Sequence, residues 1–258
     1  MPQMPFQGAA YALSSDGLAR VANSLGVFGP EVWTVVAVET SGCGYLPDRR
    51  PQILFERHIF HKLPGGRFDD ASISDPTPGG YGAPGAHQYD RLGVAITKDR
   101  NAALQSASWG IGQIMGENYA AAGFQSVDEM TEAMSQSEDV QLMAMGKFLI
   151  SAGLDTPLRA HNWPSFARGY NGSNYAINRY DIRLNGEFQK FSVSGLPDLT
   201  VRATQQYLIY LGFHPGPVDG IAGEQTFSAL AQFQIQQGLK DNGTIDGNVL
   251  AQLTAVLA

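Results

Sequence analysis

Several features are scarce in this chain of 258 residues, and each scarcity excludes a class of protein. A single cysteine excludes an internal disulfide framework. The chain has 17 Lys and Arg and 24 Asp and Glu, which gives a net charge of −7. This negative charge argues against binding to nucleic-acid phosphates. The apolar runs fall well short of the roughly 18 residues that a membrane span needs, so no membrane insertion is expected.

A recognisable leader is also missing from the printed sequence. Residues 1–7 contain neither a basic region nor an apolar run, so we expect no secretory signal and synthesis in the cytoplasm. The composition is that of a globular protein, with 43% hydrophobic and 16% charged residues. Nothing in it indicates an obligate oligomer, and a monomer is expected.

The chain divides near residue 195 into a long and a short part. Residues 1–192 are predicted to form a mainly helical domain with a strand-like segment at 53–60 and a Gly- and Pro-rich surface loop at 75–86. Helices are predicted at residues 16–25, from Pro30 to Glu39, at 137–153 and at 175–191. Residues 193–198 have the composition of a linker, and residues 199–258 contain three short helical patterns separated by Gly-containing turns.

Glu39 follows the apolar stretch 32–38 and precedes Thr40. In a helix, the valines three, four and seven residues before Glu39 share its face, so its carboxyl group lies on an apolar surface near the helix C-terminus. Burial and the negative helix end both disfavour a carboxylate, which predicts a raised pKa. A carboxylic acid still protonated near neutral pH suits the general acid of glycoside cleavage. The alternative is a surface Glu that caps the helix or pairs with Arg49 or Arg50.

Three motifs occur in order, at residues 38–42 (Val-Glu-Thr-Ser-Gly), 108–115 (Ser-Trp-Gly-Ile-Gly-Gln-Ile-Met) and 166–172 (Phe-Ala-Arg-Gly-Tyr-Asn-Gly). Together they resemble the goose-type lysozyme and soluble lytic transglycosylase superfamily, which shows Glu-Ser, Ser-x-x-Gly-hydrophobic-x-Gln and Ala-Tyr-Asn motifs. Residues 50–60 and 110–119 are more specifically similar to the phage-type N-acetylmuramidase domain found in endolysins. That resemblance covers roughly residues 10–190.

The C-terminal part has a resemblance of its own. Its Leu-Gly-Phe, Gly-x-Val-Asp-Gly and Thr-x-x-Ala-Leu-x-x-Phe-Gln motifs are similar to the small three-helix peptidoglycan-binding domain, over nearly all of residues 199–253. The two resemblances imply a mainly α fold, with a lysozyme-like α (α+β) catalytic domain at residues 1–192 and a peptidoglycan-binding domain at residues 199–258. They also make peptidoglycan the expected partner.

The resemblance assigns roles to individual residues. It implies that Glu39 protonates the glycosidic oxygen, while Ser41, displaced by Thr40 from the Glu-Ser motif, is left without a clear role. Glu56, 17 residues after Glu39, is the candidate second carboxylate; alternatively it pairs with a neighbouring Arg or His and orders the site. Glu117 and Asp90 are lesser candidates. Four further residues are expected to line the sugar subsites: Ser108, Gln113, Tyr170 and Asn171.

Two other patterns suggest different chemistry. His58-x-x-His61 suggests a metal site, but in a strand this spacing does not place both rings on one face, and no third ligand of obvious type follows. Cys43 is expected to be a small packed residue rather than a nucleophile, because no Cys-His pattern accompanies it. We therefore predict neither a metal nor a cofactor.

The resemblance implies a peptidoglycan hydrolase that cleaves the β-1,4 bond between N-acetylmuramic acid and N-acetylglucosamine. A lytic transglycosylase, which breaks the same bond without water, and a non-catalytic cell-wall-binding protein remain the alternatives. Action on the cell wall after synthesis without a signal peptide is expected to follow release through a holin or delivery by a secretion machine.

Overall fold

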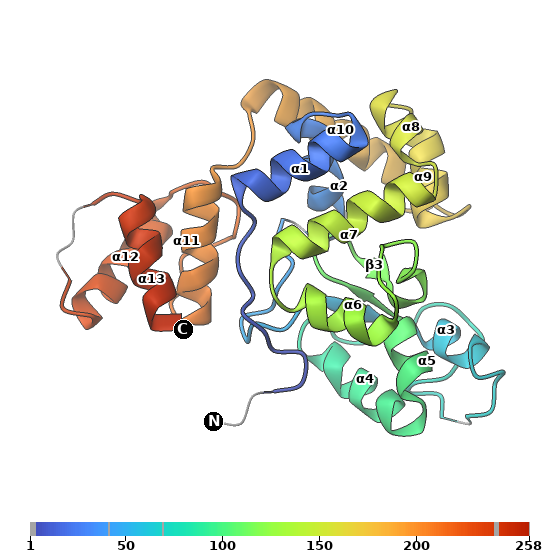
Figure 1. The fold of residues 1–258 in the computed structure, drawn as a ribbon. Coiled ribbons are helices and arrows are strands. Elements are labelled where there is room, and N and C mark those ends of the chain that lie inside the picture. The colour runs from blue at the N-terminus through green and yellow to red at the C-terminus, as the bar shows by residue number, and fades with distance from the viewer. Residues whose placement is uncertain (1–3, 41, 69, 240–242, 258) are drawn as a thin grey trace.

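The computed structural model describes residues 4–40, 42–68, 70–239 and 243–257, which fold mainly into helices around two hydrophobic cores. Figure 1 shows a larger body, formed by the chain through its yellow and light-orange helices, and a smaller orange-to-red helical group beside it. The predicted mainly α architecture is confirmed.

The first two helices are α1 (Ser15–Leu25) and α2 (Gly29–Thr40). Ser14 caps α1 by accepting a hydrogen bond from the Gly17 amide, and Gly26 ends it with a left-handed φ of 65°. Both helices were predicted, but α2 is buried nearly all round rather than on one face, which makes it the central helix of the larger body. No single helix in the described part of the chain is long and apolar enough to cross a membrane; α1 and α2 pass that test only as a pair bent by 105°.

A small antiparallel sheet has the order β1-β2-β3 and consists of β1 (Ile53–Phe55), β2 (Ala107–Trp109) and β3 (Ile114–Met115). The strand predicted at residues 53–60 is wrong beyond its first half, because α3 (Arg57–Lys62) begins there. Phe60 lies in α3 with its ring centroid 5.8 Å from that of Phe55 and 5.5 Å from that of Phe68. Burial of this ring against both partners overrides the strand preference of the local sequence.

Short helices surround the sheet, namely α4 (His87–Lys98), α5 (Arg100–Gln105), the 3₁₀ helix η1 (Gly116–Asn118) and α6 (Val127–Met134). The predicted surface loop at residues 75–86 is confirmed, and one side chain ties it to the sheet. The buried Gln88 donates to the carbonyls of Tyr81 and Ala83, at 2.8 and 2.7 Å, and accepts from the Phe55 amide at 3.0 Å. The loop is thereby held beside the end of β1.

The larger body is completed by α7 (Glu138–Ser151), α8 (Asp155–Arg159), α9 (Trp163–Asn171) and α10 (Tyr180–Ser194). The helix predicted at residues 137–153 is confirmed, with Ser137 as its N-cap. The helix predicted at 175–191 begins later, and it extends through Val193 and Ser194 into the predicted linker. Only residues 195–198 therefore connect the two parts without regular structure.

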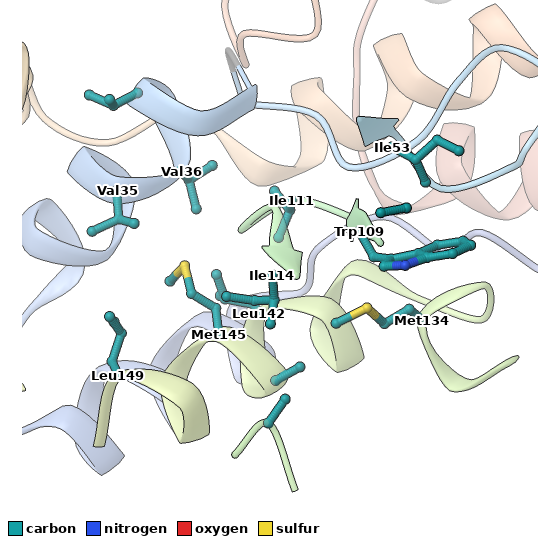
Figure 2. Close-up of a cluster of buried hydrophobic side chains, with 14 of the residues drawn as sticks. Val35, Val36, Ile53, Trp109, Ile111, Ile114, Met134, Leu142, Met145 and Leu149 are labelled. Atoms are coloured by element: carbon teal, nitrogen blue, oxygen red, sulfur yellow. The ribbon is translucent and has the colours of Figure 1, made fainter. Parts of the chain in front are cut away.

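The main core lies between α2, the sheet and α7. Figure 2 shows Val35 and Val36 of α2 across from Leu142, Met145 and Leu149 of α7, with the residues of the sheet beside them. All five side chains are fully buried. This packing fixes the end of α2 against the turn between β2 and β3.

The C-terminal helices are α11 (Leu199–Tyr210), α12 (Glu224–Gln236) and α13 (Gly247–Leu257), as the three-helix prediction requires. Their own small core includes Leu208, Phe233 and Leu253, each fully buried. The chain before α1 passes between this unit and the larger body (Figure 1), so the two parts are in contact through more than the connecting segment.

Candidate active site

Glu39 is the second-last residue of α2, and its side chain is partly buried. Val35 and Val36, one turn before it, are fully buried. Burial raises the pKa of Glu39 from the ordinary 4.5 to about 7, against a hydrogen bond from Tyr180 and the charge of Arg183, which both lower it. The raised pKa predicted from the sequence is therefore confirmed, with burial as its cause.

The surface alternative for Glu39 is wrong. Arg50 pairs with Asp48 at 2.6 Å, and the guanidinium of Arg49 donates to the carbonyls of Gly8 and Leu257. Both arginines are thus engaged elsewhere. The hydrogen-bond partner of the Glu39 carboxyl group is the uncharged side chain of Tyr180.

Tyr180 and Arg183 are site residues that the sequence did not reveal. Both lie on α10, which packs along α2, and they are three residues apart and so on the same helical face. The Tyr180 hydroxyl donates to Oε1 of Glu39, and Arg183 Nη2 donates to the carbonyl of Val38 at 2.9 Å. The only sequence signal was a Tyr–x–x–Arg spacing in an otherwise polar helix, which is too common to mark a site.

Tyr170 and Asn171 end α9 beside this group, but their environments differ. Tyr170 is partly buried, stacks on Phe166 with centroids 5.4 Å apart, and donates from its hydroxyl to the carbonyl of Gly112. Burial, and then the nearby Glu39, raise the pKa of its hydroxyl. Asn171 is exposed. Tyr170 is therefore a packing residue next to the acid, and Asn171 is free to meet a ligand.

Ser108 and Gln113 are brought together by the turn between β2 and β3. Ser108 is buried, and its hydroxyl donates to Oε1 of Gln113 at 2.7 Å. The Gln113 amide nitrogen donates to the carbonyls of Gly110 and Gln52, at 2.9 and 3.3 Å, and its backbone has a left-handed φ of 48°. The turn is joined to the helix of the acid, because the Thr40 hydroxyl donates to the carbonyl of Ile111 at 3.1 Å.

Glu56 follows β1 directly, and its backbone amide donates to the Ser106 carbonyl at 2.8 Å. Its Oε2 lies 3.0 Å from Nδ1 of His58, but the pair lacks hydrogen-bond geometry. Burial raises the pKa of Glu56, while His58 and a hydrogen bond from Tyr81 lower it. Glu56 is thus partly buried and lies next to a His, as expected if it pairs with a neighbouring residue and orders the site.

The lesser carboxylates and Ser41 add little to the site. Asp90 is 81% exposed and lies near His87 on α4, and Glu117 lies in η1. Ser41 lies outside the residues that the structure describes.

His58 and His61 both lie in α3, so the strand spacing expected for them is wrong. His61 instead has its Nδ1 3.0 Å from the Ser74 hydroxyl. Among the described residues, no group of three or more His, Cys, Asp or Glu could hold a metal ion. Cys43 is partly buried, and burial raises the pKa of its thiol to about 12, so it is protonated and unreactive at neutral pH.

A cavity of about 430 Å³ lies next to the end of α2, lined by Ala37 and Gly42, by Phe191 of α10, and by Val218 and Asp219 of the C-terminal part. Neither this cavity nor another of about 530 Å³ is lined by any of the predicted site residues. The raised pKa of Glu39, and not a cavity, is what marks the candidate site.

Comparison with known proteins identifies the family of each part of the chain. The family model of N-acetylmuramidase matches residues 29–192, and that of the peptidoglycan binding domain matches residues 198–253. The crystal structure of the Burkholderia AP3 phage endolysin is similar with a TM-score of 0.64 and 36% identity, over 74% of this chain and 73% of the endolysin chain. A protein of Nostoc punctiforme described as an OxPP cycle protein, OpcA, is 31% identical over 93 residues, 30% of this chain. The matched segment spans only 20% of that relative.

Proposed function

Because the chain belongs to the N-acetylmuramidase family of peptidoglycan hydrolases and carries a peptidoglycan-binding domain, we propose that it hydrolyses the β-1,4 bond between N-acetylmuramic acid and N-acetylglucosamine. The observation that carries this proposal is the partly buried Glu39 with its pKa of about 7. Its place of action is then the bacterial cell wall, which the protein reaches after release or delivery from the cell that makes it.

Glu39 acts as the general acid. With a pKa of about 7, a substantial fraction of its carboxyl groups is protonated at neutral pH and can donate to the oxygen of the leaving sugar. After proton transfer, the hydrogen bond from Tyr180 and the positive charge of Arg183 stabilise the carboxylate that remains. The two residues of α10 therefore keep the pKa from rising so far that the acid would be too weak to donate.

Glu56 is the second carboxylate of the proposal. In an inverting hydrolase it would activate water, with the two carboxyl groups about 6.5–9.5 Å apart, and in a retaining hydrolase it would be the nucleophile, at about 5–5.5 Å. Burial raises the pKa of Glu56; His58 and Tyr81 oppose this by lowering it, towards the ionised form that either role requires. Exposed Asn171 supplies an amide contact for the sugars, while Ser108 holds Gln113 in the turn and Tyr170 packs beside Glu39.

The second candidate is a lytic transglycosylase, favoured by the contacts of Glu56. A carboxyl group with Tyr81 as hydrogen-bond partner and His58 beside it fits an orienting group as well as a catalytic one. In this reaction Glu39 protonates the leaving oxygen and then acts as base, so that the 6-hydroxyl of the muramic acid attacks its own C1. The product is a 1,6-anhydro-muramic end, and no water is consumed.

Mass spectrometry of muropeptides released from purified sacculi distinguishes these functions. Products with a free reducing muramic acid, absent with Glu39→Gln, are expected for the hydrolase. Anhydro-muramic products would assign the transglycosylase instead. Intact sacculi with the wild-type protein across a range of pH values would reject both and leave a wall-binding protein.

Glu56→Gln then tests the second carboxylate. A loss of turnover comparable to that of Glu39→Gln is expected if Glu56 activates water or attacks the sugar. Glu132→Gln, which changes an exposed Glu on α6, is the matched control. Turnover within about threefold of wild type for Glu56→Gln would limit Glu56 to an ordering role, since a positioned acid or base contributes about 10²–10⁴-fold.

A further inference from the structure

Arg202 is a fully buried cation on α11 of the peptidoglycan-binding domain. Its partner is the equally buried Glu138, the first residue of α7 in the muramidase domain. The pair is bidentate, with Nη1 2.6 Å from Oε2 and Nη2 2.7 Å from Oε1. Moving two charges out of water costs free energy. Only good geometry and further hydrogen bonds offset that cost, so the other contacts of this buried pair matter for its stability.

Most of the remaining hydrogen bonds of this pair go to one short segment, residues 42–44. Arg202 Nε donates to the carbonyl of Gly42 at 2.9 Å, and Glu138 Oε1 accepts from the Gly44 amide at 2.8 Å. Glu138 Oε2 accepts from the Leu13 amide at 2.8 Å. The ion pair thus fixes the backbone on both sides of Cys43, and Gly42 is only three residues beyond Glu39.

The hydrogen bonds continue from this segment to the turn that carries Gln113. Gln52 donates two hydrogen bonds to this segment. Its backbone amide donates to the Gly44 carbonyl at 2.8 Å, and its Nε2 donates to the Cys43 carbonyl at 2.9 Å. The Gln52 carbonyl in turn accepts from the Gly110 amide at 2.8 Å and from Gln113 Nε2 at 3.3 Å. A continuous chain of hydrogen bonds therefore links Arg202 to the predicted sugar-binding turn.

The two domains are also joined outside this ion pair. The Ala12 amide donates to the Tyr207 hydroxyl at 3.1 Å, and the Tyr210 hydroxyl donates to the carbonyl of Ala10 at 3.2 Å. Arg49 Nη1 reaches the carbonyl of Leu257 at 3.1 Å. These contacts are those of a docked domain, whereas a module that only raises the local substrate concentration needs no fixed orientation.

We propose that Arg202 is a positioning residue, through which the peptidoglycan-binding domain orders residues 42–44 and thereby aligns Glu39 with the turn of Gln113. The proposal rests on the function proposed above. It makes the C-terminal domain a structural part of the active site as well as a wall anchor. Turnover of a small soluble glycan, which gains nothing from wall tethering, consequently depends on Arg202.

The test measures kcat and KM on soluble, peptide-free glycan oligomers of alternating N-acetylglucosamine and N-acetylmuramic acid. Arg202→Met is expected to lower kcat by about 10–100-fold with KM within about threefold, because small misplacements of reacting groups slow the chemical step at that scale. Arg202→Lys retains the charge but not the planar guanidinium, and its kcat is expected to lie between those of the wild type and Arg202→Met. Arg100→Met, which breaks an exposed ion pair with Asp128, is the control and should leave both constants unchanged.

A double variant separates positioning from stability. Arg202→Met with Glu138→Gln removes both buried charges, so its Tm is expected to recover towards wild type relative to Arg202→Met alone. Its kcat is expected to stay low, because the bond to the Gly42 carbonyl is still absent. Recovery of kcat together with Tm, or a wild-type kcat in Arg202→Met, would overturn the proposal.

Hydrogen exchange provides a readout that does not need activity. In Arg202→Met the amides of Gly44 and Gly110 are expected to exchange at least tenfold faster than in the wild type and in Arg100→Met. If the wild-type protein cleaves no glycan, the proposed function fails and exchange alone decides this inference. Unchanged exchange at Gly44 and Gly110 would then reject the positioning role.

Discussion

Replacing Glu39 with Gln is expected to change how the stability of the protein depends on pH. The folded protein holds this proton with a pKa of about 7, against an ordinary value of 4.5, a difference of about 2.5 units. At 1.36 kcal/mol per unit, ionised Glu39 lowers the free energy of unfolding by up to about 3 kcal/mol. The Gln side chain has a similar shape and no charge, so the variant escapes this cost.

The direction of the effect follows from which state holds the proton. Below pH 4.5 Glu39 is neutral in both states, and its pKa difference has no effect on relative stability. Between pH 4.5 and 7 the unfolded chain releases the proton while the folded protein keeps it, so wild-type stability falls as the pH rises. Above pH 7 the cost is complete. Glu39→Gln should therefore gain about 3 kcal/mol relative to wild type between pH 4 and pH 8.

Urea unfolding of both proteins at pH 4, 5, 6, 7 and 8 measures this difference. Glu132→Gln, an exposed change on α6, is the control and should run parallel to wild type. The same Glu39→Gln protein should lose about 10²–10⁴-fold in turnover of sacculi, as expected for loss of a general acid. A stability difference between Glu39→Gln and wild type that does not change with pH would refute the burial argument, whatever the activity shows.

Three further predictions concern the pKa of Glu39 and the packing of the muramidase domain. Tyr180→Phe removes a hydrogen bond that lowers the pKa of Glu39, so the alkaline limb of the pH–rate profile should move above its wild-type midpoint near 7; an unmoved limb would contradict this. Gly116→Ala places a Cβ 2.1 Å from a backbone carbonyl of α5 and should cost about 1–3 kcal/mol in urea unfolding, with a wild-type midpoint arguing against the close contact. Gln141→Ala leaves the buried Ile111 amide without its 2.7 Å partner and should cost about 1–3 kcal/mol; a neutral effect would indicate another acceptor.

Local sequence patterns predicted most helices because the forces that favour a helix act over a few residues. At residues 137–153, apolar residues at helical spacing, among them Leu142, Met145 and Leu149, sufficed. The same approach failed at residues 57–60, where the packing of Phe60 accompanies a helix in place of the predicted strand. Short segments are decided by their tertiary partners, which lie outside the local pattern.

For the candidate site, too, local patterns predicted one part, and contacts between distant residues decided the other. Helical spacing alone identified Glu39 as a carboxyl group on an apolar helix, and hence its raised pKa. Its partner Tyr180 is 141 residues away in the chain, and Arg202, which holds the Gly42 carbonyl, is 160 residues from that glycine. The sequence by itself thus determined the mainly α architecture and the raised pKa of Glu39. Only the tertiary structure decided which donors surround that acid, because helix packing brings together side chains that no short-range pattern relates.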